Sequence, residues 1–184
     1  MKKDIVLCGV GGQGILTISR IIVMAAQKEG FFFKQAEVHG MSQRGGSVYA
    51  HLRLSRKKIF SPIIPVGEAD LVLSMEPLEA LRHAHYLKKN GLLVSASKKL
   101  PNIEYDENTV LAEIKRLKGC LIDSRLLAEK AGSALSENMV LLGASVKAIG
   151  LRKELLETAI QEAFSSKKEI AETNLKAFRL GFSR

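Results

Sequence analysis

The chain has only two cysteines among its 184 residues, Cys8 and Cys120. An iron–sulfur cluster typically takes four thiolates, and a disulfide framework needs several paired cysteines. Both are therefore excluded for this chain alone. Cys8 falls in an apolar stretch, where cysteine is more often an inert small hydrophobe than a reactive thiol. We interpret it as a core residue.

Long hydrophobic runs are also missing. After the polar start at residues 2–4, the first apolar run covers only residues 5–10, and glycines follow it directly. Such a run is too short for a signal peptide or a membrane span. The sequence therefore predicts a cytoplasmic protein that does not contact a membrane.

Tryptophan is absent and tyrosine occurs three times, whereas Lys and Arg exceed Asp and Glu by 28 to 19. The resulting charge of +9 favours an acidic partner surface, a phosphorylated ligand or nucleic acid. The basic pairs are scattered and lack the interleaved aromatics of nucleic-acid binders. They are Lys57-Lys58, Lys88-Lys89, Lys98-Lys99 and Lys167-Lys168. We interpret them as solvated faces and expect no nucleic-acid partner.

Short apolar runs alternate with helical patterns along the chain. Strands are expected at residues 5–8, 31–33, 48–54, 71–73, 92–94 and 120–122, with 58–60 as an antiparallel continuation. Helices are expected at residues 15–29, from 77 to a stop at Gly91, at 110–117, and over 138–178 with breaks at Gly150 and Ser165-Ser166. Ser166 and Glu169 have capping-box spacing for the last helix.

This order predicts an α/β fold, a Rossmann-like, mostly parallel sheet with helices on both faces and a C-terminal helical segment. The length and the 46% of apolar residues favour one domain over residues 1–184. Ligands in such folds bind beyond the carboxyl ends of the strands.

A glycine-rich segment follows the first predicted strand with G-x-G-x-x-G spacing, as Gly9-Val10-Gly11-Gly12-Gln13-Gly14. It could seat a phosphate at the N-terminus of the next helix, or it could be a tight turn without a ligand. Glu37 lies twenty-three residues after Gly14, roughly where a dinucleotide site has its acidic residue.

A second segment, His39-Gly40-Met41-Ser42-Gln43-Arg44-Gly45-Gly46, places polar side chains among glycines between two strands. Ordering such a loop costs entropy, which favours a ligand or docking loop over a solvated one. Arg44 offers a fork for a carboxylate or phosphate. The binding or interface candidates are Gly9, Gly11, Gly12, Gln13, Gly14, His39, Ser42, Gln43, Arg44, Gly45 and Gly46.

No catalytic residue and no metal site is expected. His39 and His51 have no nucleophile or carboxylate placed beside them by sequence. His83 and His85 are two positions apart on a predicted helix, so they face different ways and are read as surface histidines.

Three ordered motifs, at residues 9–15, 39–48 and 76–82, together with residues 138–144, resemble the gamma-type domain of the 2-oxoacid:ferredoxin oxidoreductases over nearly the whole chain. The resemblance implies an assembled enzyme that decarboxylates an aryl 2-oxoacid, with indolepyruvate favoured, on thiamine diphosphate. Electrons pass through iron–sulfur clusters to ferredoxin, and an acyl-CoA is released.

In this family a large alpha subunit holds the thiamine diphosphate and the clusters. The resemblance implies that the present chain is a small subunit without its own cofactor, inactive alone, which completes the complex and contacts ferredoxin only indirectly. We expect that coenzyme A could sit at the helix N-terminus after Gly14, with Gln13 and Arg44 as polar contacts.

The segment at residues 95–101 departs from the family pattern, which leaves an aromatic or a branched-chain 2-oxoacid open. Two other classes also remain: a free-standing Rossmann-like dinucleotide-binding protein or dehydrogenase, and a basic nucleic-acid-binding module. The chain could also be a structural adaptor whose loops only dock the large subunit. Whether it forms a homodimer in isolation is left open by the sequence.

Overall fold

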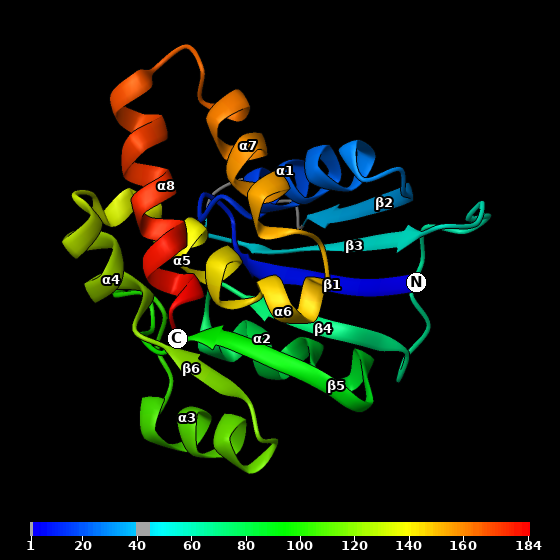
Figure 1. Ribbon diagram of the computed structural model, residues 1–184. Coiled ribbons are helices and arrows are strands. Elements are labelled where there is room, and N and C mark those ends of the chain that lie inside the picture. Colours follow the sequence, from blue (N-terminus) through cyan, green and yellow to red (C-terminus); the bar gives the residue numbers. More distant parts are fainter. Residues whose placement is uncertain (1, 40–44) are drawn as a thin grey trace.

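The computed structural model describes residues 2–39 and 45–184. Its centre is a six-stranded sheet with the order β2-β3-β1-β4-β5-β6 (Figure 1). The strands are β1 (Lys2–Val10), β2 (Phe32–His39), β3 (Ser47–Ser55), β4 (Ala69–Ser74), β5 (Leu87–Ala96) and β6 (Cys120–Ile122). β1, β4, β5 and β6 are mutually parallel, and β3 is antiparallel to both β1 and β2. The mostly parallel α/β sheet predicted from the sequence is therefore confirmed.

Helices cover both faces of this sheet. They are α1 (Ile15–Lys28), α2 (Pro77–His83), α3 (Glu107–Arg116), α4 (Ser124–Ala131), α5 (Glu137–Ala144), α6 (Val146–Ile149), α7 (Lys153–Ala163) and α8 (Lys168–Phe182), with short 3-10 turns at Ala84–Tyr86 and Ala134–Ser136. Buried residues of α2 and α3 pack with Val6, Val72 and Leu93 on one face. The remaining helices, including the C-terminal segment, pack on the other face.

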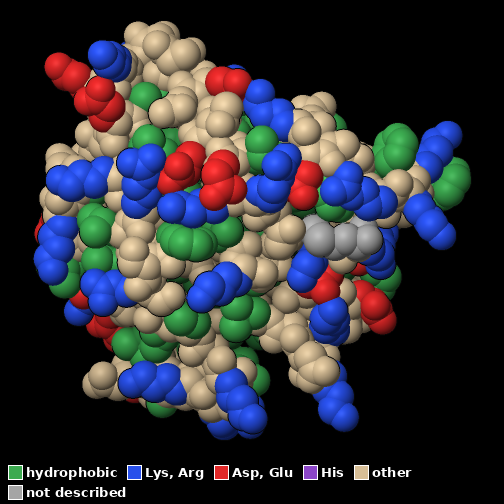
Figure 2. Space-filling view, viewed as in Figure 1, with side chains coloured by type: hydrophobic (Ala, Val, Ile, Leu, Met, Phe, Trp, Pro, Cys, Tyr) green, Lys and Arg blue, Asp and Glu red, His purple; other side chains and the backbone are tan. Residues whose placement is uncertain are grey.

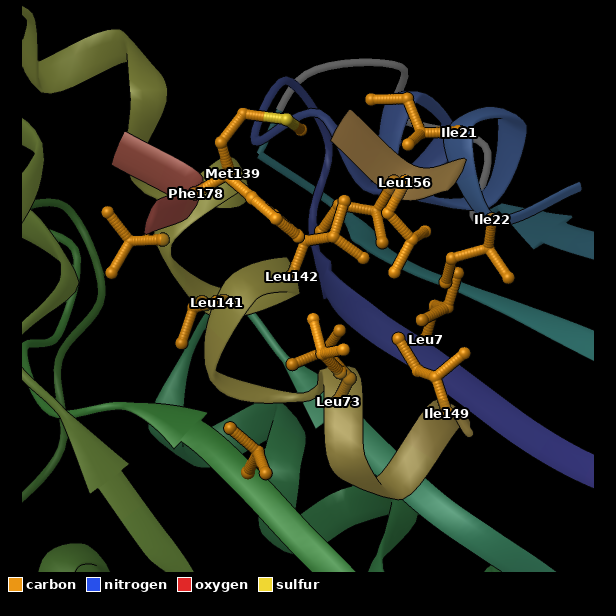
Figure 3. Packing of buried hydrophobic residues seen from close by; sticks show 14 of the residues in the cluster. Leu7, Ile21, Ile22, Leu73, Met139, Leu141, Leu142, Ile149, Leu156 and Phe178 are labelled. Atoms are coloured by element: carbon orange, nitrogen blue, oxygen red, sulfur yellow. The ribbon is translucent and has the colours of Figure 1, made fainter. Parts of the chain in front are cut away.

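Alternation along the strands decides which side chains enter which core, because successive residues of a strand point to opposite faces. Leu7 and Leu73 point to the side of α1 and the C-terminal helices. Figure 3 shows both leucines in the same apolar cluster as Ile22, Leu142 and Leu156, which come from three different helices. This larger core holds the sheet against α1, whose N-terminus borders the glycine-rich segment.

Helices α5 and α8 approach each other closely through two glycines. A Cβ atom added at Gly143 would overlap the carbonyl oxygen of Phe178, and one added at Gly181 would overlap the carbonyl oxygen of Val140. The backbones therefore touch where the two glycines stand. Phe178, the largest completely buried side chain among the described residues, fills the space beside this contact.

Several predicted boundaries are wrong. Residues 58–60 form no strand, because the chain there runs as an irregular loop from β3 to β4. The helix that begins at Pro77 ends at His83, and Gly91 lies inside β5 instead of ending a helix. There, a Cβ atom would stand 2.6 Å from the carbonyl oxygen of Ala69, so glycine permits the close strand approach.

Two features near the C-terminal half also differ from expectation. Helix α4 was not predicted, although Asp123 caps it by accepting from the Leu126 N–H. The last helix is preceded by Lys167 as its N-cap, without a side-chain cap, so Ser166 does not form the predicted capping box. In the described part of the chain, no helix is both long enough and apolar enough to cross a membrane.

Candidate functional site

The glycine-rich segment lies at the carboxyl end of β1 and turns the chain directly into α1. Gly12 and Gly14 have φ values of 102° and 79°, in the region that favours glycine. The Gly11 N–H donates to the carbonyl oxygen of Gly46 at 2.9 Å. The two segments singled out in the sequence are therefore neighbours, because β3 begins at the end of the sheet where β1 finishes.

A pocket of about 410 Å³ opens beside this turn. It is lined by Val10, Gly11, Gly12, Gly14, Ile15, Leu16 and Val48. Helix α1 begins at its wall with no side-chain cap and no acidic residue in its first turn. Neither a capping side chain nor an acidic residue of the first turn thus compensates the positive end of the helix dipole, which is the arrangement that attracts an anion.

Gln13 holds the turn in place with both ends of its side-chain amide. Its Oε1 accepts from the Val10 N–H at 2.8 Å, and its Nε2 donates to the carbonyl oxygen of Met75 at 3.0 Å. The amide is therefore engaged by the backbone of β1 and of the segment after β4. In this conformation Gln13 positions the turn and has little capacity left for a ligand.

Asn138, at the start of α5, supports the other side of the turn. Its Nδ2 donates to the carbonyl oxygen of Gly14 at 3.5 Å, and its side chain fills the space that a Cβ at Gly14 would need. Gly14 is therefore required both by its positive φ and by this contact. The resemblance motif at residues 138–144 contains this contact, although sequence reasoning gave Asn138 no role.

Two buried carboxylates lie just behind the site, on the segment that follows β4. Glu76 accepts from the Tyr105 hydroxyl at 2.5 Å, and Glu79 accepts from the Ser47 hydroxyl at 2.5 Å and from Arg82. Neither carboxylate is more than 2% exposed. Burial, followed by the bond to Glu76, raises the pKa of Tyr105.

These carboxylates tie the site's segments together. Glu79 bonds to the first residue of β3, Ser47, and Gln13 bonds to the residue before Glu76. Sequence reasoning quoted Glu76 and Glu79 within a motif but assigned them no function. The sequence signal that could have identified them is the position of two acidic residues shortly after a buried parallel strand, where such folds place functional side chains.

The Cys8 thiol is fully buried in β1 and donates to the carbonyl oxygen of Glu79 at 3.6 Å. Burial raises its pKa to about 12. The thiol therefore stays protonated and unreactive at neutral pH, in agreement with its interpretation as a core residue.

Two histidines are buried on the α2 face. His51 accepts a hydrogen bond at Nδ1 from the Ile64 N–H at 2.9 Å, and His83 lies against Tyr49 with ring centroids 4.6 Å apart. The prediction that His83 lies at the surface is wrong, since only 7% of it is exposed. It is covered because α2 ends at His83 and the chain folds back over it toward β5.

Stability is expected to fall in mild acid because of these two histidines. Burial lowers the pKa of His51 and of His83 below 6.5; His51 also feels His83 and Arg53, and Glu79 partly offsets the effect at His83. As the pH falls, these histidines therefore take up protons in the unfolded chain before they do so in the folded chain. The free energy of unfolding has its full value above about pH 6.5 and decreases as the pH falls below it. Each histidine contributes a slope of up to about 1.4 kcal/mol per pH unit.

Urea unfolding at about pH 7.5 and about pH 5.5 measures this difference. His51→Gln and His83→Gln should each reduce it, whereas His85→Gln should reduce it less, because its exposed ring only adds a smaller effect to the lowered pKa of His83. A difference that survives in the double variant His51→Gln/His83→Gln would contradict the assignment.

Glu37 lies too far from the glycine turn to complete a dinucleotide site. It is exposed on β2, the edge strand, and β3 separates β2 from β1. In a dinucleotide-binding fold the strand that ends in the acidic residue lies beside the first strand. This arrangement disfavours the dehydrogenase alternative.

The remaining predicted residues are only partly placed. Gly45 and Gly46 lie beside the turn, and His39 ends β2 opposite Val48. Ser42, Gln43 and Arg44 lie outside the described residues, so their predicted contacts remain predictions. Within residues 2–39 and 45–184, no three His, Cys, Asp or Glu residues form a group suited to a metal ion.

Comparison with known sequences gives matches over the whole chain. The family described as pyruvate ferredoxin/flavodoxin oxidoreductase matches residues 4–184. The indolepyruvate oxidoreductase subunit IorB of Archaeoglobus fulgidus is 39% identical, over 100% of this chain and 96% of the relative. The common gamma subunit of pyruvate/ketoisovalerate oxidoreductases of Pyrococcus abyssi is 34% identical, over 96% and 93%.

Solved structures share the fold. The gamma subunit of a keto/oxoacid ferredoxin oxidoreductase from Geobacter sulfurreducens superposes with a TM-score of 0.71 at 27% identity, covering 98% of this chain and 96% of that one. The 2-oxoglutarate:ferredoxin oxidoreductase of Magnetococcus marinus, solved with coenzyme A bound, gives a TM-score of 0.79 at 22% identity. The match covers 99% of this chain but 30% of that longer one.

Proposed function

Because the chain belongs to the pyruvate ferredoxin/flavodoxin oxidoreductase family, we propose that it is the small subunit of a cytoplasmic indolepyruvate:ferredoxin oxidoreductase, formed by one gamma-type domain. One observation supports indolepyruvate as the substrate. The chain is 39% identical over its full length to an indolepyruvate oxidoreductase subunit, but 34% identical to a subunit shared by pyruvate and ketoisovalerate enzymes. The enzyme converts an aryl 2-oxoacid and CoA to an acyl-CoA and CO2, with reduction of ferredoxin.

In this proposal the redox chemistry takes place on the large alpha subunit, which carries thiamine diphosphate and the iron–sulfur clusters. The present chain has two cysteines, of which Cys8 is buried and protonated, so it has no set of thiolates for a cluster. Its part is to complete the complex and to contribute one wall of the site.

We propose that the pocket at the glycine turn is this part of the site and binds the phosphates of CoA. The uncapped N-terminus of α1 offers N–H donors and the positive end of a dipole. Gly11 and Gly12 leave the backbone bare at the pocket wall, so an anion can approach it closely. Arg44 is the proposed cationic contact, and Gln13 acts by holding the turn.

An adaptor that only docks the large subunit would need the same loops but no ligand. The two roles differ in what a pocket-filling substitution does, because docking tolerates a change inside the pocket whereas a phosphate seat does not. The pocket's apolar walls beside an uncapped helix end favour a bound ligand with both apolar and anionic parts over a simple contact.

Anaerobic reconstitution tests the proposed function. The chain and its large subunit are purified separately, and CoA-dependent reduction of ferredoxin is measured with indolepyruvate, phenylpyruvate and pyruvate. We expect activity only from the mixture, with the aryl substrates preferred. Preference for pyruvate would contradict the substrate, and failure of the two chains to associate would contradict the assignment itself.

A further inference from the structure

The end of the sheet opposite the glycine turn carries a projecting loop between β3 and β4, residues 56–68. Three apolar side chains stand exposed on it: Phe60 at 83%, Val66 at 66% and Ile63 at 52%. Figure 2 shows hydrophobic side chains flanked by Lys and Arg on this projection, which is the teal tip of Figure 1. Exposed apolar side chains that share one loop with basic residues are a recognised mark of interaction sites.

This loop is held firmly although it projects. Arg53 donates through Nη1 to the carbonyl oxygens of Ser61 at 3.2 Å and Ile63 at 3.0 Å. Ile64 is buried, and its N–H donates to His51. Phe60 is therefore presented on an ordered support, which lowers the entropic cost of binding a partner through it.

The charge around the loop is positive. Arg56, Lys57 and Lys58 begin it, and Glu68 at its far end is its one acidic residue. Lys57 and Lys58 are exposed and form no salt bridge within the described residues. Asp4, on the adjoining strand β1, is 1% exposed and already pairs with Arg53 and Lys2.

A hollow of about 280 Å³ lies between these groups. Lys2, Arg53 and Lys58 line it, and Phe60 forms one wall. The three cationic side chains outnumber the single carboxylate of the lining, Asp4, so the hollow carries a net positive charge and can bind a further negative group. The apolar wall suits an acidic side chain that stands beside an apolar one.

From this we propose that the β3–β4 loop docks an acidic, partly apolar face of the large subunit, with a partner carboxylate entering the hollow between Lys2 and Lys58 and an apolar recess receiving Phe60. The inference rests on the proposed function, since the large subunit is the partner. It assigns a second contact, at the end of the sheet away from the glycine turn. A buried aromatic anchor supplies much of the affinity at many interfaces, and complementary charges around it add specificity and speed association.

The chain offers a matched control, because Lys167-Lys168 is also an exposed lysine pair, at the start of α8 and far from the loop in Figure 1. Affinity for the purified large subunit is measured by calorimetry at low and high salt. We expect Lys57→Glu/Lys58→Glu to weaken it by about tenfold or more at low salt and to flatten its salt dependence. Lys167→Glu/Lys168→Glu should change it by less than about twofold.

Phe60→Ala supplies the apolar half of the test and should weaken binding by about tenfold at both salt concentrations. If the wild-type chain binds the large subunit and both lysine pairs behave alike, the inference is wrong while the proposed function stands. If the wild-type chain does not bind at all, the proposed function fails first. Lys57/Lys58-dependent binding to phosphatidylserine vesicles, with unchanged affinity for the large subunit, would overturn the inference in favour of a lipid surface.

Discussion

Gly143→Leu is expected to prevent stable folding, and Gly143→Ala to lower the free energy of unfolding by about 3 kcal/mol or more. Even one added carbon at Gly143 meets the backbone of Phe178 and Phe182, which cannot move aside as a flexible side chain would. The helices α5 and α8 must separate, and the core around Phe178 opens with them.

Chemical denaturation followed by circular dichroism measures the loss. Gly181→Ala should behave in the same way, because its added carbon meets the carbonyl of Val140 from the other helix. Gly132→Ala is a suitable reference: it has a positive φ of 120° but its nearest neighbour is a methyl group at 3.8 Å. A loss at Gly143 no greater than at Gly132 would contradict the close helix contact.

Gly12→Leu is expected to raise the apparent KM for CoA of the assembled enzyme by about tenfold or more, since the side chain would occupy the pocket against the N-terminus of α1. A Cβ at Gly12 meets nothing within 4 Å, so the substitution fills the pocket instead of displacing the chain. The effect on association with the large subunit should be small.

Backbone strain has to be separated from pocket filling, because Gly12 has a φ of 102°. Gly132→Leu provides that control, since Gly132 has a φ of 120°, only Thr173 within 4 Å of an added Cβ, and a place outside both the pocket lining and the β3–β4 loop. Steady-state kinetics with varied CoA compare the two. An unchanged KM for CoA in Gly12→Leu would contradict the proposed phosphate-binding site and would favour the adaptor role.

The elements predicted best are those whose signals are local. The alternation from Val48 to Leu54 gave β3 within one residue at each end, and the apolar run at Leu71 gave β4. Leu78, Leu81 and Leu87 are spaced as on one face of a helix, but Leu87 already begins β5, so local spacing does not separate the end of α2 from the start of the strand. Gly91 predicts the end of a helix, whereas in the structure it permits the close approach to β4, a contact that the local sequence does not reveal.

The candidate site shows the same division. The glycine turn was predicted because spacing and neighbouring elements suffice to define it. Its supports were not, since Asn138 lies 124 residues from Gly14 and Met75 lies 62 from Gln13. Nor does spacing reveal that β3 would come between β1 and β2, which separates Glu37 from the turn.

The contrast between the two thiols has a practical consequence for spectroscopy. Cys8 is sealed within the sheet, whereas Cys120 is exposed at the start of β6, the strand at the opposite edge from β2. A maleimide reagent at neutral pH should thus attach to one position of the native chain without any cysteine being removed. A fluorophore or spin label placed there would report the distance to a second label on the large subunit while leaving the glycine turn unmodified.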